Sequence, residues 1–273
     1  MRLTCLPVSL FSDIVSGKMS IRQWAHEAKI IGLDAIDISI MLLKNHTPVY
    51  LKKLREDLES ENMNIIMAAT YPDFTHPDEL QRERELEYLR HDIAVCSYLG
   101  IRYIRVLAGQ AHPGVKIEDG IMWAVEKLTE AARVGEKYGV ILVYEDHSKP
   151  GAWEYVDFSH PTEIFLRVFA GIKDTSIKVN FDTGNIVAYG DDPIPVLRKV
   201  MDKVETVHIS DMAEYGKLSP VVIGTGVVPN REIFALLKQN GFNGWLSIEE
   251  ASNTGLDGIK KAVSFVRNCW AHL

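Results

Sequence analysis

The chain has 273 residues, of which 47% are hydrophobic and 25% are charged, as is typical of a soluble globular protein. Its formal net charge of −7 and its isoelectric point near 5.7 give it no electrostatic attraction for nucleic acid or an anionic membrane. No run approaches the roughly 18 apolar residues of a membrane span. We therefore expect neither a nucleic-acid partner nor a membrane partner.

Eight short apolar runs alternate with longer amphipathic stretches along the whole chain. The predicted strands are Leu3–Val8, Ala35–Ile40, Asn64–Thr70, Tyr103–Ala108, Ile141–Glu145, Ile177–Asp182, Thr206–Ser210 and Trp245–Glu249. Ser20 is predicted to cap a helix that Gly32 closes, and Asn230 to cap a later one. The two longest predicted helices are His76–Leu99 and Glu118–Tyr138. Strands that alternate with helices predict a parallel sheet. At this length we expect a single (β/α)8 TIM barrel domain over residues 1–273.

The cysteines and the N-terminus carry little information about function. Cys5, Cys96 and Cys269 are widely spaced and form no CxxC pair, as expected of reduced thiols in a cytoplasmic protein. The first eleven residues lack the length and the cleavage pattern of a secretory segment, and we interpret residues 1–10 as the first strand.

Four polar residues each end an apolar run: Glu145, Asp182, His208 and Glu249. The intervals between them are 37, 26 and 41 residues, and one strand-plus-helix unit of a barrel takes about 30 residues. The four residues should therefore lie on four neighbouring strands. Because they end their strands, they should meet at the C-terminal mouth of the barrel, where barrel enzymes have their active sites.

The alternation of side chains along a strand selects between neighbouring residues. Apolar positions should face the helices, which turns Glu249 toward the interior and Glu250 to the other face. The same alternation turns Asp37 and Arg105 inward, where an ion pair within the barrel is expected. It also turns Asn180 inward.

Three carboxylates gathered at one mouth would repel one another, and a divalent cation would remove this conflict. Oxygen-rich ligation with one imidazole suits Mn²⁺ first, with Mg²⁺, Co²⁺ and Zn²⁺ as alternatives. Four protein ligands leave about two positions of an octahedron open for adjacent oxygens of a hydroxy-ketone. The metal would polarise the carbonyl and stabilise an enediolate, while flanking carboxylates move a proton at carbon.

Motifs along the whole chain resemble those of the xylose isomerase-like barrels, which include sugar epimerases, hydroxypyruvate isomerase, inosose dehydratase and endonuclease IV. The motifs are GLDAIDIS at 32–39, VYEDH around Glu145, NFDTGN around Asp182, VHISD around His208, GTGVVP at 224–229 and GWLSIEE around Glu249. The resemblance implies that Glu145, Asp182, His208 and Glu249 bind the metal. It also implies that Glu145 and Glu249 act as acid and base on opposite faces of the substrate.

The expected function is thus a metal-dependent isomerase or epimerase of a keto-sugar or polyol-ketone. The alternative is a dehydratase of the inosose or dehydroshikimate type, in which the same enolate expels a β-hydroxyl. A non-catalytic binding barrel is a third class. The expected partner is a small sugar-like molecule, and homo-oligomerisation is left open. GTGVVP lacks the Lys-Ser/Thr of a phosphate loop.

Three positions depart from the pattern of the family. Asn185 stands where epimerases and endonuclease IV commonly carry a histidine, Glu214 where sugar epimerases often place an arginine, and Gly151 where some epimerases use a glutamate. These departures argue against a ketohexose 3-epimerase. The missing histidines argue against the three-metal cluster of endonuclease IV.

Further residues near the predicted strand ends are expected to contact the substrate. They are His147, Asn185, Tyr71, Trp153 and Arg105, and Lys149 would meet an anionic group. Asp211 is expected to orient the His208 imidazole, as metal-bound histidines usually require, with a helix cap as the alternative.

Overall fold

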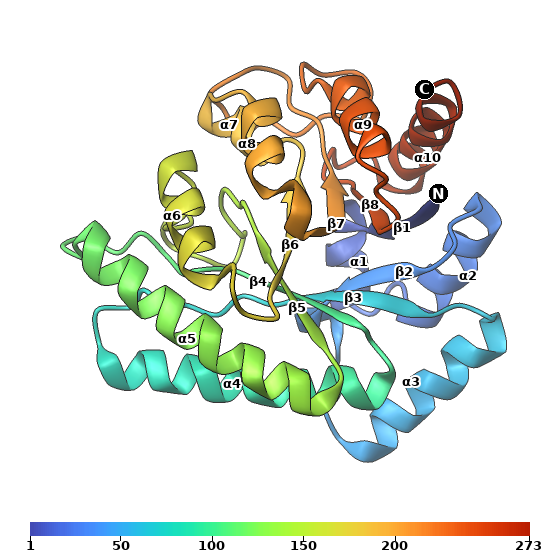
Figure 1. Ribbon diagram of the computed structural model, residues 1–273. Coiled ribbons are helices and arrows are strands. Elements are labelled where there is room, and N and C mark those ends of the chain that lie inside the picture. The colour runs from blue at the N-terminus through green and yellow to red at the C-terminus, as the bar shows by residue number, and fades with distance from the viewer.

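The computed structural model describes residues 1–273 and places eight parallel strands in a nearly closed barrel surrounded by helices (Figure 1). The strands are β1 (Arg2–Leu6), β2 (Ile36–Ser39), β3 (Ile65–Ala69), β4 (Tyr103–Val106), β5 (Ile141–Glu145), β6 (Lys178–Asp182), β7 (Val204–Ile209) and β8 (Trp245–Glu249). Every boundary lies within two residues of its prediction. The predicted (β/α)8 TIM barrel is confirmed.

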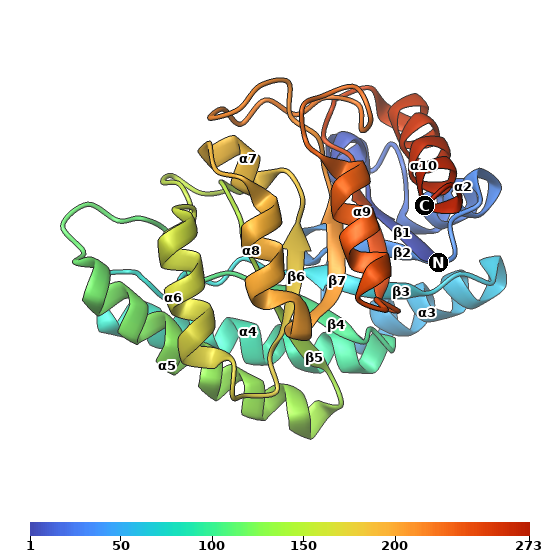
Figure 2. The same ribbon diagram turned by 45° about the horizontal axis from the view of Figure 1, so that its top comes forward.

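The helices pack around the outside of the barrel, and the two termini lie near each other beside α10 (Figures 1 and 2). The α-helices are α1 (Phe11–Val15), α2 (Ile21–Ile31), α3 (Pro48–Glu61), α4 (Glu79–Leu99), α5 (Ile117–Tyr138), α6 (Thr162–Ile172), α7 (Asn185–Tyr189), α8 (Pro193–Val200), α9 (Asn230–Gln239) and α10 (Gly255–Ala271). Three 3-10 helices are η1 (Val8–Leu10), η2 (Ile40–Leu42) and η3 (Met201–Lys203). None of these helices has the length and apolarity that crossing a bilayer requires.

The predicted start of α2 is confirmed, because Ser20 forms a capping box at its first turn. The predicted start of α4 at His76 is wrong. The following proline disfavours helical backbone at His76, and the Asp78 side chain caps the helix by accepting a hydrogen bond from Leu80 N at 3.0 Å. The predicted cap at Asn230 is also wrong, since its Nδ2 donates instead to Ser210 O at 3.1 Å.

The sheet runs in the order β1-β8-β7-β6-β5-β4-β3-β2, so every neighbouring pair except β1 and β2 is joined by a parallel ladder. Two aspartates join β1 and β2 instead. Leu3 N donates to Asp34 Oδ2 at 2.8 Å, and Asp34 N donates to Leu3 O at 2.9 Å. Deeper in the barrel, Thr4 Oγ1 donates to Asp37 Oδ1 at 3.2 Å. We call this join the β1–β2 seam.

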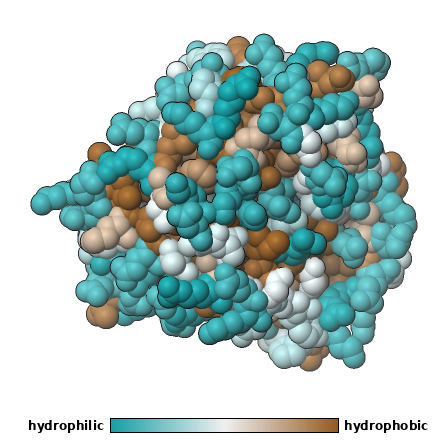
Figure 3. Space-filling view, viewed as in Figure 1, coloured by the Kyte–Doolittle hydropathy of each residue, from teal (hydrophilic) through white to brown (hydrophobic).

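The apolar core lies mainly between the strands and the helices, where 67 buried residues form one cluster. Met67, Tyr103 and Val143 form a smaller group inside the barrel. The cysteines are unpaired and buried. The face seen in Figure 3 is mostly hydrophilic, with hydrophobic residues visible between the polar ones. The apolar side chains of each strand pack against the helices. The side chains that face the barrel interior at the strand ends can therefore be polar.

Candidate metal centre

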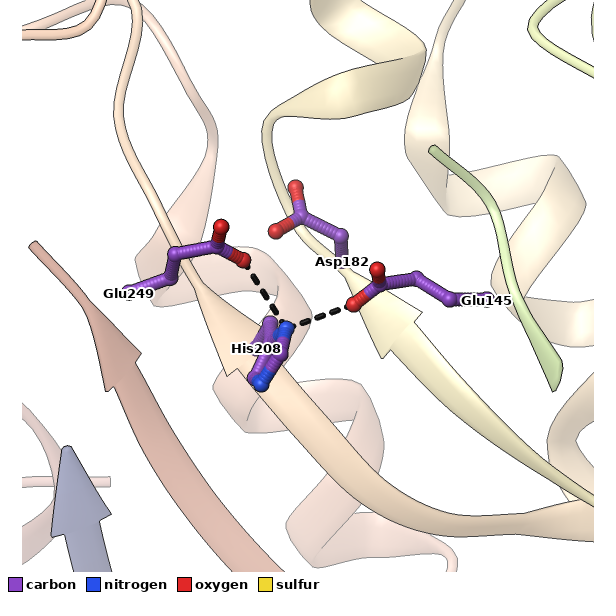
Figure 4. A group of neighbouring side chains, drawn as sticks. All are labelled: Glu145, Asp182, His208 and Glu249. Atoms are coloured by element: carbon purple, nitrogen blue, oxygen red, sulfur yellow. Dashed lines mark ion pairs between the residues drawn. The ribbon is translucent and has the colours of Figure 1, made fainter. Parts of the chain in front are cut away.

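Four consecutive strands bring Glu145, Asp182, His208 and Glu249 together at the C-terminal mouth of the barrel (Figure 4). The parallel register of β6 and β7 sets Asp182 directly beside His208. One potential ligand atom from each of the four residues lies within 4.8 Å of all the others. The first three side chains are buried, and that of Glu249 is 17% exposed. The grouping predicted from strand spacing and alternation therefore exists in the structure.

The geometry of this cluster fits a cation. Nδ1 of His208 lies 2.5 Å from Oε1 of Glu145 and 2.9 Å from Oε2 of Glu249. Nevertheless, His208 Nδ1, Glu145 Oε2 and Glu249 Oε2 are buried atoms without a partner in hydrogen-bond geometry. Unpaired polar atoms are unfavourable in a protein interior and need an explanation. A divalent ion beside His208 Nδ1 and Glu249 Oε2 would satisfy both of these atoms, while Glu145 Oε2 faces Arg105 Nε at 3.2 Å.

The ionisable groups of the cluster strongly shift one another's pKa values. Burial, reinforced by the charges of Glu249 and Glu145, raises the pKa of Asp182 to about 8. Burial would also raise the pKa of Glu249, but the imidazolium of His208 outweighs it and lowers that pKa to about 2. Burial opposes the imidazolium, yet Glu145 and Glu249 raise the pKa of His208 well above its usual range. The opposite shifts of Asp182 and Glu249 reflect a conflict among gathered carboxylates, which a divalent cation would relieve.

Glu145 is held by two side chains that do not belong to the predicted metal ligands. Asn180 Nδ2 donates a hydrogen bond to Glu145 Oε1, and Arg105 Nε lies 3.2 Å from Glu145 Oε2. Asn180 in turn accepts a hydrogen bond from Thr206 Oγ1 at 2.7 Å. The alternation had turned Asn180 inward, but its contact with Glu145 was not predicted. The available signal was a polar side chain facing inward two positions before Asp182.

The predicted ion pair between Arg105 and Asp37 is wrong. Arg105 pairs with Glu145, whereas Asp37 accepts hydrogen bonds from Ser247 Oγ at 2.5 Å and Met67 N at 3.1 Å. Arg105 on β4 reaches the neighbouring strand β5, whereas β3 separates β4 from β2, where Asp37 bonds to residues of β1, β3 and β8. Asp37 is therefore part of the β1–β2 seam.

Asp182 is oriented by the start of α7. Its Oδ1 accepts hydrogen bonds from Gly184 N, Asn185 N and Ser210 Oγ, each at 2.8 Å. These bonds occupy one carboxylate oxygen and leave Oδ2 for the cluster. Asn185 also donates from Nδ2 to Asp146 O at 3.1 Å, which fixes its side chain at the mouth.

A cavity of about 630 Å³ opens above the cluster and reaches Asp182 and Glu249. Four of the predicted substrate contacts line it, together with Lys149. These four are Tyr71, Arg105, His147 and Asn185. The Arg105 guanidinium lies over the Tyr71 ring, 4.7 Å from its centroid. Burial, followed by the charge of Arg105, lowers the pKa of His147 to about 4.

Part of the cavity lining is apolar. We call this the apolar wall; it consists of Leu6, Val8, Phe11, Met41, Leu218, Pro220 and Val221. Leu6 ends β1, and the other residues come from the segments after β1, β2 and β7. Pockets of this size hold ligands of about drug size and are usually apolar with a few convergent polar groups. The cavity can therefore hold a small organic molecule with its polar part at the metal cluster.

Two predicted residues have other places in the structure. Trp153 is 9% exposed and does not line the cavity, because a turn closed by its N–H bond to Pro150 O presents Gly151 and Ala152 there instead. Asp211 does not hydrogen bond to His208. Its carboxylate accepts four backbone N–H bonds, from Met212, Gly224, Gly226 and Val228.

Gly226 shows how tightly the GTGVVP loop wraps this carboxylate. A Cβ atom at Gly226 would lie 2.2 Å from Met212 O and 2.4 Å from Asp211 Oδ1. Glu214, by contrast, is exposed and pairs with Lys217 at 2.7 Å outside the cavity. Asp211 thus anchors the loop after β7. Glu214, which stands where sugar epimerases often place an arginine, does not reach the cavity.

Comparison with known proteins agrees with this architecture. A family model described as a xylose isomerase-like TIM barrel matches residues 25–269. The inosose dehydratase of Clostridium tetani is 26% identical over 138 residues, which are 45% of this chain and 44% of that protein. The matched part of the chain therefore spans less than half the length of this curated relative.

Solved structures with the same fold have lower sequence identity. D-psicose 3-epimerase from Clostridium cellulolyticum H10, crystallised with D-tagatose, superposes with a TM-score of 0.79 at 14% identity, covering 99% of both chains. The IOLI protein, solved with a zinc atom, superposes with a TM-score of 0.80 at 19% identity, covering 100% of this chain and 99% of that one. At these identities the likeness concerns the fold.

Proposed function

The chain belongs to the xylose isomerase-like TIM barrel family, and from the chemistry of its mouth we propose that it is a divalent-metal-dependent isomerase or epimerase of a keto-sugar or polyol-ketone. The observation that carries this proposal is the pair of glutamates beside one imidazole nitrogen. Oxygens of Glu145 and Glu249 lie 2.5 and 2.9 Å from His208 Nδ1 and belong to the strands β5 and β8. Two carboxylates that reach one point from different strands can remove and return a proton at one carbon.

The four residues of the cluster would bind the metal, for which we propose Mn²⁺ because three of the four donors are carboxylates. Zn²⁺ is the alternative, supported by the zinc atom in the similar IOLI structure. When bound, the ion would polarise a carbonyl and stabilise an enediolate. Asn180 and Arg105 orient Glu145, and the bonds to Asp182 Oδ1 leave its other oxygen free.

The substrate would lie between the polar and apolar sides of the cavity. Arg105, Tyr71 and Asn185 are placed to contact its oxygens, since all three line the cavity beside the cluster. His147 lies with its Nε2 4.0 Å from Glu145 Oε2, close enough to orient a hydroxyl next to the reacting carbon. The C–H faces of the substrate would pack on the apolar wall.

A second candidate is a dehydratase of the inosose or dehydroshikimate type on the same site. Sequence similarity to an inosose dehydratase favours it, as does the imidazole of His147 beside Glu145. In this reaction the same proton is removed from carbon. The electron pair then expels a β-hydroxyl, to which a nearby acid gives a proton, so that water leaves.

Incubation of the Mn²⁺-loaded protein with a panel of ketoses and inososes in D₂O separates the two reactions. We expect deuterium at the carbon next to the carbonyl together with an epimerised or isomerised product. Loss of water and an unsaturated product would support the dehydratase instead. Binding of a panel member without exchange, unaffected in Glu145→Gln and Glu249→Gln, would mean a non-catalytic binding barrel.

The metal can be tested without knowing the substrate. Protein purified without chelators should contain about one divalent ion per chain by elemental analysis. His208→Ala should lose it, because the substitution removes the nitrogen on which the cluster converges. His272→Ala, at an exposed position near the C-terminus, is the matched control and should keep it. A metal-free wild-type protein that still turns over a substrate would contradict the proposal.

A further inference from the structure

Gln110, which does not line the cavity, joins the loops that follow β3, β4 and β5. Its Nε2 donates to Asp73 Oδ2 at 2.9 Å, and its backbone N–H donates to Asp73 Oδ1 at 2.9 Å. Its Oε1 accepts two consecutive backbone N–H groups, Glu154 N at 2.9 Å and Tyr155 N at 3.1 Å. One amide side chain therefore connects the loop after β3 with the loop after β5.

The loop after β5 forms one side of the cavity. Asp157 N donates to Ser148 O at 2.7 Å and closes the base of a segment, residues 148–157, that we call the β5 loop. Lys149 and Gly151 of this loop line the cavity, and His147 directly precedes it. Beyond its base the loop is attached to the β4 side by Gln110 Oε1 and by the backbone bond from Ala111 N to Val156 O at 2.9 Å.

The orientation of the Gln110 amide is fixed by residues of the loop after β3. Asp73 is 6% exposed, and its Oδ2 also lies 2.7 Å from His112 Nε2. Thr75 Oγ1 donates to Gln110 O at 2.7 Å. An ionised carboxylate only accepts hydrogen bonds, so Asp73 must receive the NH₂ group of Gln110. The amide oxygen is then turned toward the β5 loop.

We propose that Gln110 is a positioning residue of the active site, which holds the β5 loop so that Lys149 and His147 face the substrate. Its effect on the reaction rests on the proposed function, whereas its hold on the loop does not. Without it, two adjacent loop amides lose their acceptor and the loop is held mainly at its base. Substrate binding then has to supply the ordering of the loop.

The first test is Gln110→Ala in the full-length, Mn²⁺-loaded protein. Amide hydrogen exchange at residues 149–156 should become at least about tenfold faster, with the helices unchanged. With D-xylulose as the ketose probe, KM should rise about tenfold while kcat stays within about threefold, because the reacting groups on β5 and β8 are untouched. Gln239→Ala removes an exposed glutamine at the end of α9, and as the matched control it should change neither quantity.

A double variant tests whether the hydrogen-bond pattern itself matters. Gln110→Glu alone places a second carboxylate against Asp73 and should loosen the β5 loop as Gln110→Ala does. Adding Asp73→Asn reverses the donor and acceptor between the two side chains and leaves a carboxylate oxygen for Glu154 N and Tyr155 N. Loop exchange and KM should return to within about threefold of the wild type, a rescue that general destabilisation cannot give.

Two results would overturn the proposal. One is unchanged amide exchange at 149–156 in Gln110→Ala, which would show that the loop is held elsewhere. The other is faster exchange with KM and the Kd of D-xylulose unchanged, which would show that the position of the loop has no effect on binding. Because exchange requires no turnover, a wild-type protein that does not act on ketoses would refute the proposed function separately.

Discussion

Asn180 donates a hydrogen bond from Nδ2 to Oε1 of Glu145, and the register of β5 and β6 pairs these two residues directly. Thr206 Oγ1 on β7 donates to Oδ1 of the same amide at 2.7 Å. This bond fixes the orientation of the Asn180 amide, with its NH₂ group toward Glu145. A chain of three inward side chains on three adjacent strands therefore sets the direction of the Glu145 carboxylate. Glu145 belongs to both the metal cluster and the pair of glutamates.

Asn180→Ala should lower kcat by about 10- to 100-fold, because metal-site residues that orient a ligand typically contribute this much. The metal content should remain near one ion per chain, since the four ligands are intact. Asn243→Ala, at an exposed position, is the matched control. Kinetics with the best substrate of the panel and elemental analysis provide the measurements. An unchanged kcat would mean that Glu145 needs no support from Asn180.

Glu249 and Glu250 are adjacent glutamates with different surroundings. Glu249 faces the cluster, whereas Glu250 is buried on the other face, where its Oε1 accepts a hydrogen bond from Ser252 N at 2.9 Å. Glu249→Gln should lower kcat by at least about 100-fold, the usual contribution of a general acid or base. Glu250→Gln keeps the acceptor oxygen and should stay within about threefold. Equal losses in the two variants would refute the assignment.

Asp211→Ala should lower the free energy of unfolding by about 2–4 kcal/mol, because four backbone N–H groups lose a charged acceptor. Urea denaturation monitored by circular dichroism measures the change. Asp174→Ala, at an exposed position, should change it by less than about 0.5 kcal/mol. A similarly small effect for Asp211→Ala would show that the GTGVVP loop holds its shape without the carboxylate.

Asp37 should make the stability of the protein depend on pH. Burial raises its pKa from 3.8 to about 6, so the folded protein binds a proton more tightly than the unfolded chain does. The free energy of unfolding should therefore fall as pH rises from about 4 to about 6, by at most about 3 kcal/mol from this group. Above that range its contribution is constant.

Asp37→Asn removes this titration and keeps an acceptor for Met67 N. The difference in unfolding free energy between variant and wild type should shift in favour of the variant between pH 4 and pH 7. Urea denaturation at several pH values measures it. A difference that is the same at both ends of the range would mean that Asp37 has an ordinary pKa in the folded protein.

The strands and the metal cluster could be predicted because they depend on local patterns. Apolar runs at regular spacing locate the strands, and alternation alone selects Glu249 over Glu250. Because the strands are parallel, their C-terminal ends all lie at the same mouth of the barrel. His208 and Asp182 lie side by side for this reason.

The contacts of the loops could not be predicted, because their partners are distant in the sequence. Trp153 turns away from the cavity through a turn that begins at Pro150, and Asp211 bonds to loop amides up to 17 residues further along. Arg105 pairs with Glu145 instead of Asp37 because of where the strands lie around the barrel. Alternation shows that a side chain faces inward but not which inward residue it meets.

The β1–β2 seam is the one place around the barrel where neighbouring strands are not joined by a backbone ladder. The metal cluster belongs to β5–β8, a stretch joined throughout by ladders. Val8, Phe11 and Met41, by contrast, follow β1 and β2, which only side chains and one loop bond hold together. The circumference can widen at the seam without breaking a ladder. We therefore expect the part of the apolar wall that follows β1 and β2 to adjust to substrates of different width, while the ladders keep the distances among the metal ligands constant.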